Sequence, residues 1–434
     1  MRTLKYILAL ITLGSTIGFA QQTPAPAQTE AITIVGATAH IGNGQVIDKS
    51  VIIMKDGKII ACVDQLTSKI AYQGKIIKAE GKHVYPGIIA PNTTLGLQEI
   101  GAVRATNDTR EIGDINPNIR SLIAYNAESK IVESMRPNGV LIGQVTPRGG
   151  TVSGTSSIVQ FDAWNWEDAA LKVDDGMHMN WPNTFTRGRW WLGEDPGLKP
   201  NNNYGKNVAA ADMFVAESKA YLSGDRKTKN LKYEAMAGLF NGSQKLYVHV
   251  NDEKGIRDAI EFKGKHGIEH MAIVGGYQAV KVTDLLKKHN IGVLAQRVHR
   301  TPNSDDHDYD YPYKMAKLLV DTGVLVGLEN SGGMERANAR NLPFQAGTVA
   351  AHGLDKEEAL KLITSNTAKI LGIDDRLGTL EQGKDATLFV SEGDALDMRT
   401  NIVTHAFING RELSLESHHT KLYKRYAKKY GQMD

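Results

Sequence analysis

The middle of the chain alternates short apolar runs with amphipathic stretches, and this alternation limits the fold more than any other feature. The apolar, strand-like runs are residues 84–89, 140–145, 157–161, 246–250, 271–274, 291–295 and 324–328. Stretches with helical spacing, such as residues 279–288 and 313–321, separate several of these runs. Short apolar strands separated by helices predict a parallel sheet that is buried on both faces.

Seven such runs favour a (β/α)8 barrel over an open doubly wound sheet, with an eighth strand expected inside residues 164–204. The same segment contains all five tryptophans. This segment is interpreted as a long loop over the barrel mouth. It is either a packed surface insertion or an aromatic wall that contacts a ligand. No glycine-rich phosphate-binding motif follows the first strand, so the nucleotide-binding classes lose their best support.

Both ends of the chain predict β structure. Residues 32–35, 50–54 and 59–63 near one end, and 386–390 and 402–408 near the other, are rich in β-forming residues and flank turn sequences. We therefore expect α/β architecture with a small composite β domain, a β-sandwich built from residues 31–83 with 383–415, beside a barrel of residues 84–382. The basic tail, residues 416–434, predicts a solvated amphipathic helix.

The first residues are typical of an export signal. Residues 1–20 begin with Arg2 and Lys5, continue as an apolar run and end in small residues, which predicts a cleaved signal peptide. The alternative, a membrane anchor, is disfavoured because the apolar run has about 14 residues where about 20 are needed. Residues 21–30 predict a flexible leader. The mature protein is then expected in the periplasm or secreted, with no membrane association after cleavage.

Charge and cysteine content exclude further classes. The formal charge is +3, and removing residues 1–20 leaves 49 basic against 48 acidic side chains. A near-neutral chain lacks the electrostatic footprint of a protein that binds nucleic acid or anionic lipid, so we expect no nucleic-acid partner. The single cysteine, Cys62, cannot form an intramolecular disulfide.

Three ordered sequence blocks resemble the amidohydrolase superfamily, specifically its imidazolonepropionase-like branch. They are GKHVYPGII at residues 81–89, ALKLITSNTAKILG at 359–372 and GTLEQGKDA at 378–386. The resemblance covers nearly all of residues 31–415. It implies a barrel with a split β domain and metal-dependent hydrolysis of amide, cyclic amide or amine C–N bonds.

The resemblance also implies a metal site, from which this sequence departs. The family has a His-x-His pair after strand 1, histidines from strands 5 and 6, and an aspartate after strand 8. Here Asn92 and Thr94 stand at the two histidine positions and Ala90 at a neighbouring aspartate position. Amide and hydroxyl groups replace imidazole poorly as zinc ligands. Glu329 stands at the strand-8 aspartate and is the candidate catalytic base.

The remaining candidates are histidines and arginines near strand ends. His249 ends a predicted strand and matches the strand-5 ligand, whereas His270 matches the strand-6 ligand but precedes its strand. Because barrel sites lie at the carboxyl ends of the strands, His270 is the weaker candidate. Arg297, His299 and Arg340 are candidate substrate-binding residues of the rim, and Asn92 and Thr94 join them.

Two principal hypotheses about function follow. The first is an exported hydrolase of a small, cyclic or peptide-like amide, with at most one metal ion (zinc before others) and Glu329 as base. The second is a catalytically silent member of the fold, without metal, that binds a ligand or pairs with an active paralogue. A structural or carbohydrate-binding protein is a third class, supported by the tryptophans alone. A homo-oligomer is compatible with each.

Overall fold

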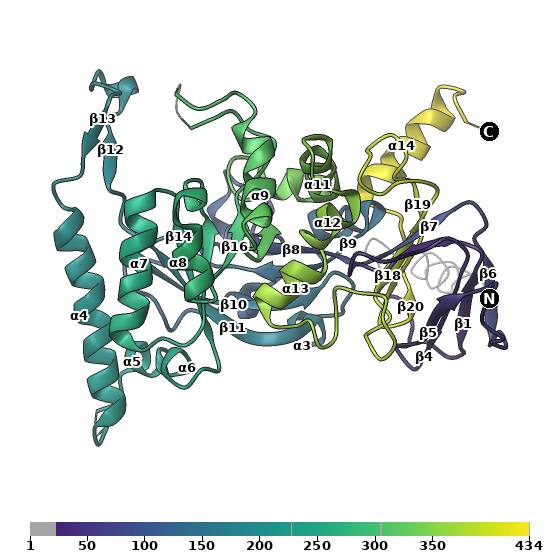
Figure 1. The fold of residues 1–434 in the computed structure, drawn as a ribbon, viewed down its shortest axis with the longest axis horizontal. Helices are drawn as coiled ribbons and strands as arrows, with labels where there is room; N and C mark the ends of the chain where they lie inside the picture. Colours follow the sequence, from purple (N-terminus) through teal and green to yellow (C-terminus); the bar gives the residue numbers. More distant parts are fainter. Residues whose placement is uncertain (1–22, 227, 304–305, 434) are drawn as a thin grey trace, which may run out of the picture.

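The computed structural model describes residues 23–226, 228–303 and 306–433. The predicted signal peptide, residues 1–20, therefore lies outside the described residues, as does the start of the leader. The largest sheet forms the centre of the molecule (Figure 1). In the order in which they pair, its strands are β17 (Val326–Leu328), β16 (Gly292–Ala295), β15 (Met271–Gly275), β14 (Lys245–Val250), β11 (Ala170–Asn180), β10 (Val152–Gln160), β9 (Val140–Val145) and β8 (Ile88–Thr93).

This sheet confirms the expected barrel fold, with one strand reversed. Strand β10 pairs antiparallel with both β9 and β11, whereas residues 157–161 were expected to form a parallel strand. The cause is the connection, since only residues 146–151 link β9 to β10, with Gly149 and Gly150 at positive φ. A parallel pair needs a crossover of about a dozen residues or more, so a link this short returns the chain antiparallel.

Two other strand predictions are refined. The expected eighth strand inside residues 164–204 is present as β11. The expected strand at residues 84–89 is two strands divided at Gly87: β7 (His83–Pro86) belongs to a smaller sheet, and β8 begins the barrel. A continuous apolar run does not reveal such a division, because both strands are buried.

The barrel is closed at its seam by a loop rather than by strand pairing. Strands β8 and β17 are the two ends of the sheet order. Ile89 N donates to Ile363 O (3.0 Å) and Leu328 N donates to Leu362 O (2.9 Å). The backbone between α12 (Lys356–Lys361) and α13 (Ser365–Leu371) therefore satisfies both strand edges, as buried backbone groups require.

Helices cover the outside of the barrel (Figure 1). The longer ones are α4 (Tyr204–Ser223), α7 (Glu253–His266), α8 (Thr283–Lys288), α9 (Tyr311–Asp321) and α11 (Leu342–Ala351). Short helical turns are α2 (Lys130–Glu133), α3 (Trp166–Ala169), α5 (Leu231–Glu234), α6 (Ala237–Phe240) and α10 (Glu335–Asn338). Local sequence sets these boundaries: α7 begins where the Asp252 side chain accepts from Gly255 N and ends at Gly267, with φ 66°.

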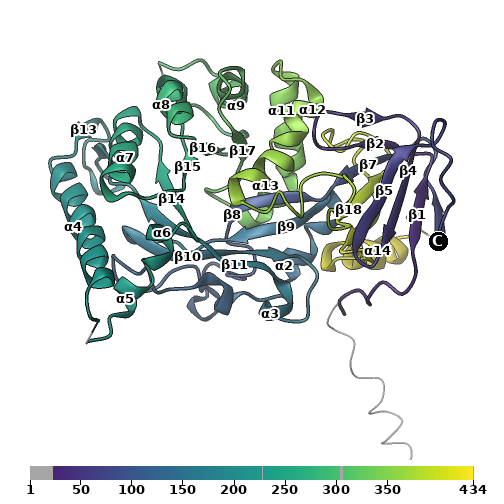
Figure 2. The same cartoon turned by 60° about the horizontal axis from the view of Figure 1, so that its bottom comes forward.

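Two smaller sheets lie beside one end of the barrel, and the second of them combines strands from both ends of the chain (Figure 2). The first contains, in order, β5 (Lys58–Asp64), β4 (Ser50–Lys55), β1 (Ile32–Val35) and β6 (Lys75–Lys78). The second contains β20 (Arg411–Glu412), β19 (Val403–Ile408), β18 (Leu388–Ser391), β7, β2 (Thr38–His40) and β3 (Val46–Ile47). One apolar cluster, with Ile34, Ile52 and Phe407 fully buried, joins them. The expected α/β fold with a composite β unit is confirmed.

Two elements project from this body. A hairpin of β12 (Phe185–Arg187) and β13 (Leu198–Pro200) extends away from the barrel, and α14 (His418–Lys429) lies beside the smaller sheets (Figures 1 and 2). The hairpin occupies part of the tryptophan-rich segment, whose Trp181 is instead buried. Within the described ranges, no helix combines the length and apolar character that crossing a bilayer would require.

Candidate functional site

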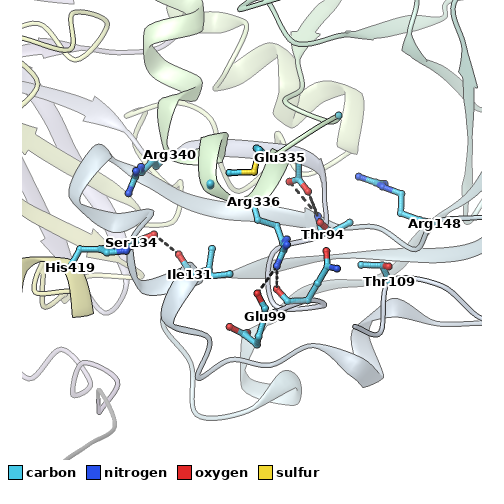
Figure 3. Close-up of a pocket in the computed structure, with 14 residues that line it drawn as sticks. Thr94, Glu99, Thr109, Ile131, Ser134, Arg148, Glu335, Arg336, Arg340 and His419 are labelled. Atoms are coloured by element: carbon cyan, nitrogen blue, oxygen red, sulfur yellow. Dashed lines mark hydrogen bonds between the residues drawn. The ribbon is translucent and has the colours of Figure 1, made fainter. Parts of the chain in front are cut away.

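A cavity of about 500 Å³ opens where β8, β9 and β17 end (Figure 3). Thr94 follows β8, Arg148 follows β9, and Glu335 comes from the segment after β17. All three strand ends are carboxyl ends, the edge at which barrel proteins place their reacting groups. In the view of Figure 3, Arg336 lies between Arg340 and Arg148 along the cavity.

Asn92 connects a half-buried cation, Arg148, to a buried carboxyl group. Arg148 Nη1 donates to Asn92 Oδ1 (2.6 Å) and Nη2 donates to the Asn92 carbonyl oxygen (2.7 Å). Asn92 Nδ2 donates to Glu329 Oε2 (3.2 Å). The backbone of Asn92 is left-handed, with φ 50°, a conformation that asparagine tolerates better than most residues. One amide thus holds Arg148 and Glu329 on its two sides.

Glu329 is a buried carboxyl group with an unusual proton affinity. Its exposure is 1%, and Oε2 also accepts from Ser331 N (2.6 Å). Burial raises the pKa of Glu329, while hydrogen bonds from Ser331 and the charge of Arg148 partly oppose that shift. A carboxyl group whose pKa is moved towards neutrality is suited to taking up and releasing a proton.

A second carboxylate lies closer to the cavity. Glu335 accepts from Thr93 Oγ1 (2.5 Å) and from Thr94 Oγ1 (2.5 Å), and Thr94 N approaches its Oε2 at 3.2 Å. Adjacent residues of a regular strand point to opposite faces, so the shared partner reflects the left-handed turn at Asn92. Asn92 and Thr94, which were expected to belong to one site, therefore form hydrogen bonds with different carboxylates: Asn92 with Glu329 and Thr94 with Glu335.

A hydrogen-bonded chain of side chains runs inward from His249. His249 Nε2 lies 2.8 Å from His178 Nδ1, and His178 Nε2 lies 2.9 Å from Ser156 Oγ. Ser156 Oγ donates to Asp175 Oδ1 (2.7 Å). Since the Ser156 proton is directed at Asp175, Ser156 accepts from His178 Nε2–H, and His178 Nδ1 then accepts from His249 Nε2–H. This series of hydrogen bonds therefore places the proton of neutral His249 on Nε2.

Burial keeps this chain uncharged at its histidines. Burial lowers the pKa of His249 to about 3, with the nearby Arg148 charge adding to the effect. Burial also lowers the pKa of His178 well below its usual value, and raises that of Asp175. Neutral imidazoles beside a guanidinium avoid placing two cations in one low-dielectric site.

The structure brings only some of the sequence candidates together. Asn92 and Glu329 are in contact, and Arg340 lines the cavity. Arg297 Nη1 donates to Gly333 O (2.7 Å) on the loop that follows Glu329. His299 bonds instead to Thr348 Oγ1 (2.7 Å), in a separate cavity beside α11.

His270 does not join His249. It precedes β15, its side chain is 48% exposed, and its Nε2 lies 3.5 Å from Glu269. In the parallel pairing of β14 with β15, His249 is opposite Val274, so His270 lies at the amino end of the strands. The expected pairing of these histidines on one metal ion is therefore not supported by their positions.

The residues at the expected metal position do not fit a divalent ion. Among the described residues, no group of three or more histidine, cysteine, aspartate or glutamate side chains is arranged to hold one. Asn92 has both side-chain atoms engaged, and His249 uses Nε2 to bond His178. Arg148 already places a positive charge beside Asn92, and this charge would oppose the binding of a metal cation there.

This arrangement predicts the outcome of a restoration experiment. We expect the double variant Asn92→His with Thr94→His to remain far below stoichiometric zinc, because the two side chains diverge and Arg148 fills the site. Metal content per chain is measured by plasma mass spectrometry after growth in zinc. The control is His249→Ala in the otherwise native chain, which should leave the metal content unchanged. Stoichiometric zinc in the double variant, lost when His249→Ala is added to it, would contradict the interpretation.

The buried histidines predict a loss of stability in acid. A histidine whose folded pKa lies below its unfolded value, near 6.5, stabilises the fold above that value. The stabilisation is lost as the pH falls towards the folded pKa, about 3 for His249. The free energy of unfolding, from denaturant titrations, should fall by up to about 1.4 kcal/mol per pH unit for each histidine. His178→Gln should flatten this slope, whereas the exposed-site control His270→Gln should not.

Sequence reasoning missed Arg148, Glu335 and His178. Arg148 carried a usable signal, since it is a cation three residues beyond a predicted strand, at the edge where barrel sites form. Glu335 carried none, because its partners are set by the irregular turn at Asn92. His178 lies in β11, whose bounds the sequence pattern did not resolve.

The fold and the site define a barrel protein with polar chemistry at the carboxyl ends of its strands. The amidohydrolase family model matches residues 241–413. An imidazolonepropionase of Thermoplasma volcanium is 31% identical over 421 aligned residues, covering 91% of this chain and 98% of the relative. The chain belongs to the amidohydrolase family, in its imidazolonepropionase-like branch.

Solved structures agree at the level of the fold. An amidohydrolase from Thermotoga maritima MSB8 superposes with a TM-score of 0.75 at 22% identity, covering 88% of this chain and 99% of that one. A molinate hydrolase matches with a TM-score of 0.53 at 16% identity, covering 91% and 96%. Members of the family typically use a divalent metal such as zinc.

Proposed function

We propose that this chain hydrolyses a C–N bond in a small, cyclic or peptide-like amide, with Arg148 and Glu329 as its reacting centre. The observation that carries the proposal is the half-buried guanidinium of Arg148 and the buried carboxyl group of Glu329 on the two sides of Asn92. Family membership supports hydrolysis of a C–N bond. The donor set supports a centre without a histidine-bound metal.

In the proposed reaction, water adds to the amide carbonyl carbon while Glu329 takes up its proton. The carbonyl oxygen becomes an oxyanion, and the Arg148 guanidinium stabilises it. The C–N bond then breaks, and the nitrogen leaves with the proton that Glu329 returns. The products are an amine and a carboxylic acid, which releases its proton to the solvent, and Glu329 is again ionised. Since Glu329 is 1% exposed, the exposed Gly332-Gly333 segment that follows it has to open for the substrate to enter.

Arginines on the cavity wall favour a substrate with an anionic arm. Arg336 Nη1 donates to the carbonyl oxygens of Gln98 (2.6 Å) and Glu99 (2.8 Å), and Arg340 lines the same cavity. The name of the imidazolonepropionase relative describes a ring with a carboxylate arm, which this cavity suits in charge. We propose an imidazolone or a related lactam bearing a carboxylate as the first substrate to test.

The test is a turnover assay with imidazolonepropionate, carboxylate-bearing lactams, dipeptides and an uncharged lactam. We expect turnover of at least one anionic compound. Arg340→Ala should raise its KM with little change in kcat, and should leave the uncharged compound unaffected. No turnover of any compound, with binding of the intact ligand seen by calorimetry, would reject hydrolysis.

That last outcome would favour a second function, a ligand-binding protein without catalysis. The observation behind it is the burial of Asn92 and Glu329, each 1% exposed, with their polar atoms engaged by protein groups. Such a chain would bind a small amide or serve as partner to an active paralogue.

We also propose that the protein is exported to the periplasm or the medium, on the sequence of residues 1–20. The expected result is a mature chain that begins near Gln21, found outside the cytoplasm after fractionation. Amino-terminal sequencing of the purified protein measures this. A cytoplasmic protein that retains residues 1–20 would overturn it.

A further inference from the structure

The tip of the β12–β13 hairpin has an unusual concentration of exposed apolar side chains. Trp190 is 71% exposed, Trp191 65% and Leu192 60%. At the base of the same hairpin, Phe185 is 53% exposed and Leu198 56%. Single exposed apolar residues are ordinary, but a contiguous group of this kind marks an interaction surface. The hairpin also projects away from the barrel rather than packing on it (Figure 1).

The charged residues near the tip of the hairpin are paired with one another, whereas Arg187 in β12 is exposed and makes no ion pair within the described part of the chain. Arg189 Nη2 lies 2.7 Å from Glu194 Oε1, and Lys199 Nζ lies 3.2 Å from Asp195 Oδ2. The tip therefore presents an apolar surface with little net charge. Anionic lipid and nucleic acid attract surfaces with unpaired cations, so these partners are disfavoured relative to a protein surface.

The area of this surface suits an exchange between two copies of the chain. The five apolar side chains expose on the order of 600 Å², from the usual areas of aromatic residues. A two-fold pair would bury roughly twice that area from these side chains alone, which reaches the lower limit of about 1,200 Å² for stable interfaces. A two-fold interface is also self-complementary, so one hairpin has to offer both the inserting and the receiving surface.

The receiving surface lies at the hairpin base. A cavity of about 680 Å³ is bounded by Phe185, Arg187 and Leu198 from the hairpin, and by Tyr277 and His307 from the loops after β15 and β16. Polar and charged side chains, among them Asp252 and Lys281, complete its lining. Tyr277 and His307 form an aromatic wall, with ring centroids 5.2 Å apart. Two hairpins lying antiparallel about a two-fold axis would bring each tip against the base of the other.

We propose that the protein is a homodimer in which Trp190 and Trp191 of each copy insert into the aromatic cavity beside the partner's hairpin. The partner copy then contributes a wall to a cavity at the carboxyl edge of the barrel. This inference uses neither Glu329 nor Arg148, so it stands or fails independently of the proposed hydrolysis.

The first experiment measures mass in solution. The full mature chain should be a dimer by light scattering and sedimentation. The double variant Trp190→Ser with Trp191→Ser should raise the dimer dissociation constant by roughly 100-fold, since buried tryptophans dominate such interfaces. The matched control is Trp164→Ser, which removes a tryptophan of 65% exposure outside the hairpin and should leave the dimer intact. A monomeric native protein, or a double variant that dimerises normally, would overturn the proposal.

A cross-link tests the tip-to-base arrangement. Leu192→Cys combined with Lys281→Cys should give a covalent dimer on mild oxidation, while Leu192→Cys alone should not. A covalent dimer from the single variant would place the two tips together and would contradict insertion into the cavity. Vesicle flotation of the native protein that is lost in the tryptophan variant would identify a membrane as the occupant, and would equally overturn the proposal.

Discussion

Glu329→Gln is expected to lower the turnover number of the hydrolase by a factor of about 10² to 10⁴, the usual contribution of a positioned general base. The amide preserves the size of the side chain and the hydrogen bond from Ser331 N, but it cannot take a proton from water. Initial rates with the best substrate of the turnover panel measure the effect. A rate within a few-fold of the native one would remove Glu329 from the reacting centre.

The same variant should be no less stable than the native protein at neutral pH. A carboxyl group whose folded pKa is raised contributes stability below its unfolded pKa, and that contribution is lost as the pH rises through the folded value. Above the unfolded pKa the native protein therefore carries a cost for burying this carboxyl group, which glutamine avoids. Arg148 keeps Glu335 as a nearby counter-charge. The control is Glu99→Gln, a cavity carboxylate outside the reacting pair, which should retain activity.

The sequence predicted most of the fold, because burial leaves a direct record in composition. A strand such as β15, which is buried along its whole length, appears as an uninterrupted apolar run, and the turns between its strands indicate the composite β unit. The direction of β10 was not predicted. The direction depends on the length of the connection between β9 and β10. That length, residues 146–151, can be counted only once the end of β9 and the start of β10 are known.

The sequence predicted where in the fold the site residues lie, but only some of the contacts between them. Glu329 and Asn92 were identified at strand ends and are in contact. The left-handed backbone at Asn92 could not be read from residue types, so its separation from Thr94 was missed. The position of Arg148 after a predicted strand was a usable signal, but its contact with Asn92, 56 positions away along the chain, leaves no local pattern.

A buried ion network joins the barrel to the composite β unit and supplies the second large effect. Asp162, which follows β10, is 1% exposed. Its carboxylate lies 2.8 Å from Arg411 Nη1 in β20 and 3.1 Å from Arg136 Nη1, and it accepts from Ala25 N (2.9 Å). Burial lowers the pKa of Arg136, while the charge of Asp162 opposes that shift. The carboxylate thus stabilises the cations that pack around it.

Asp162→Ala is accordingly expected to lower the free energy of unfolding by about 3–5 kcal/mol, because it leaves buried guanidinium groups without their counter-charge. Urea unfolding followed by circular dichroism measures the loss. Combining Asp162→Ala with Arg136→Met and Arg411→Met should recover much of it, since the uncompensated charges are then removed. Asp195→Ala, which breaks an exposed pair with Lys199, should cause no measurable change. If Asp162→Ala were equally silent, the two parts of the molecule would be held together by apolar packing alone.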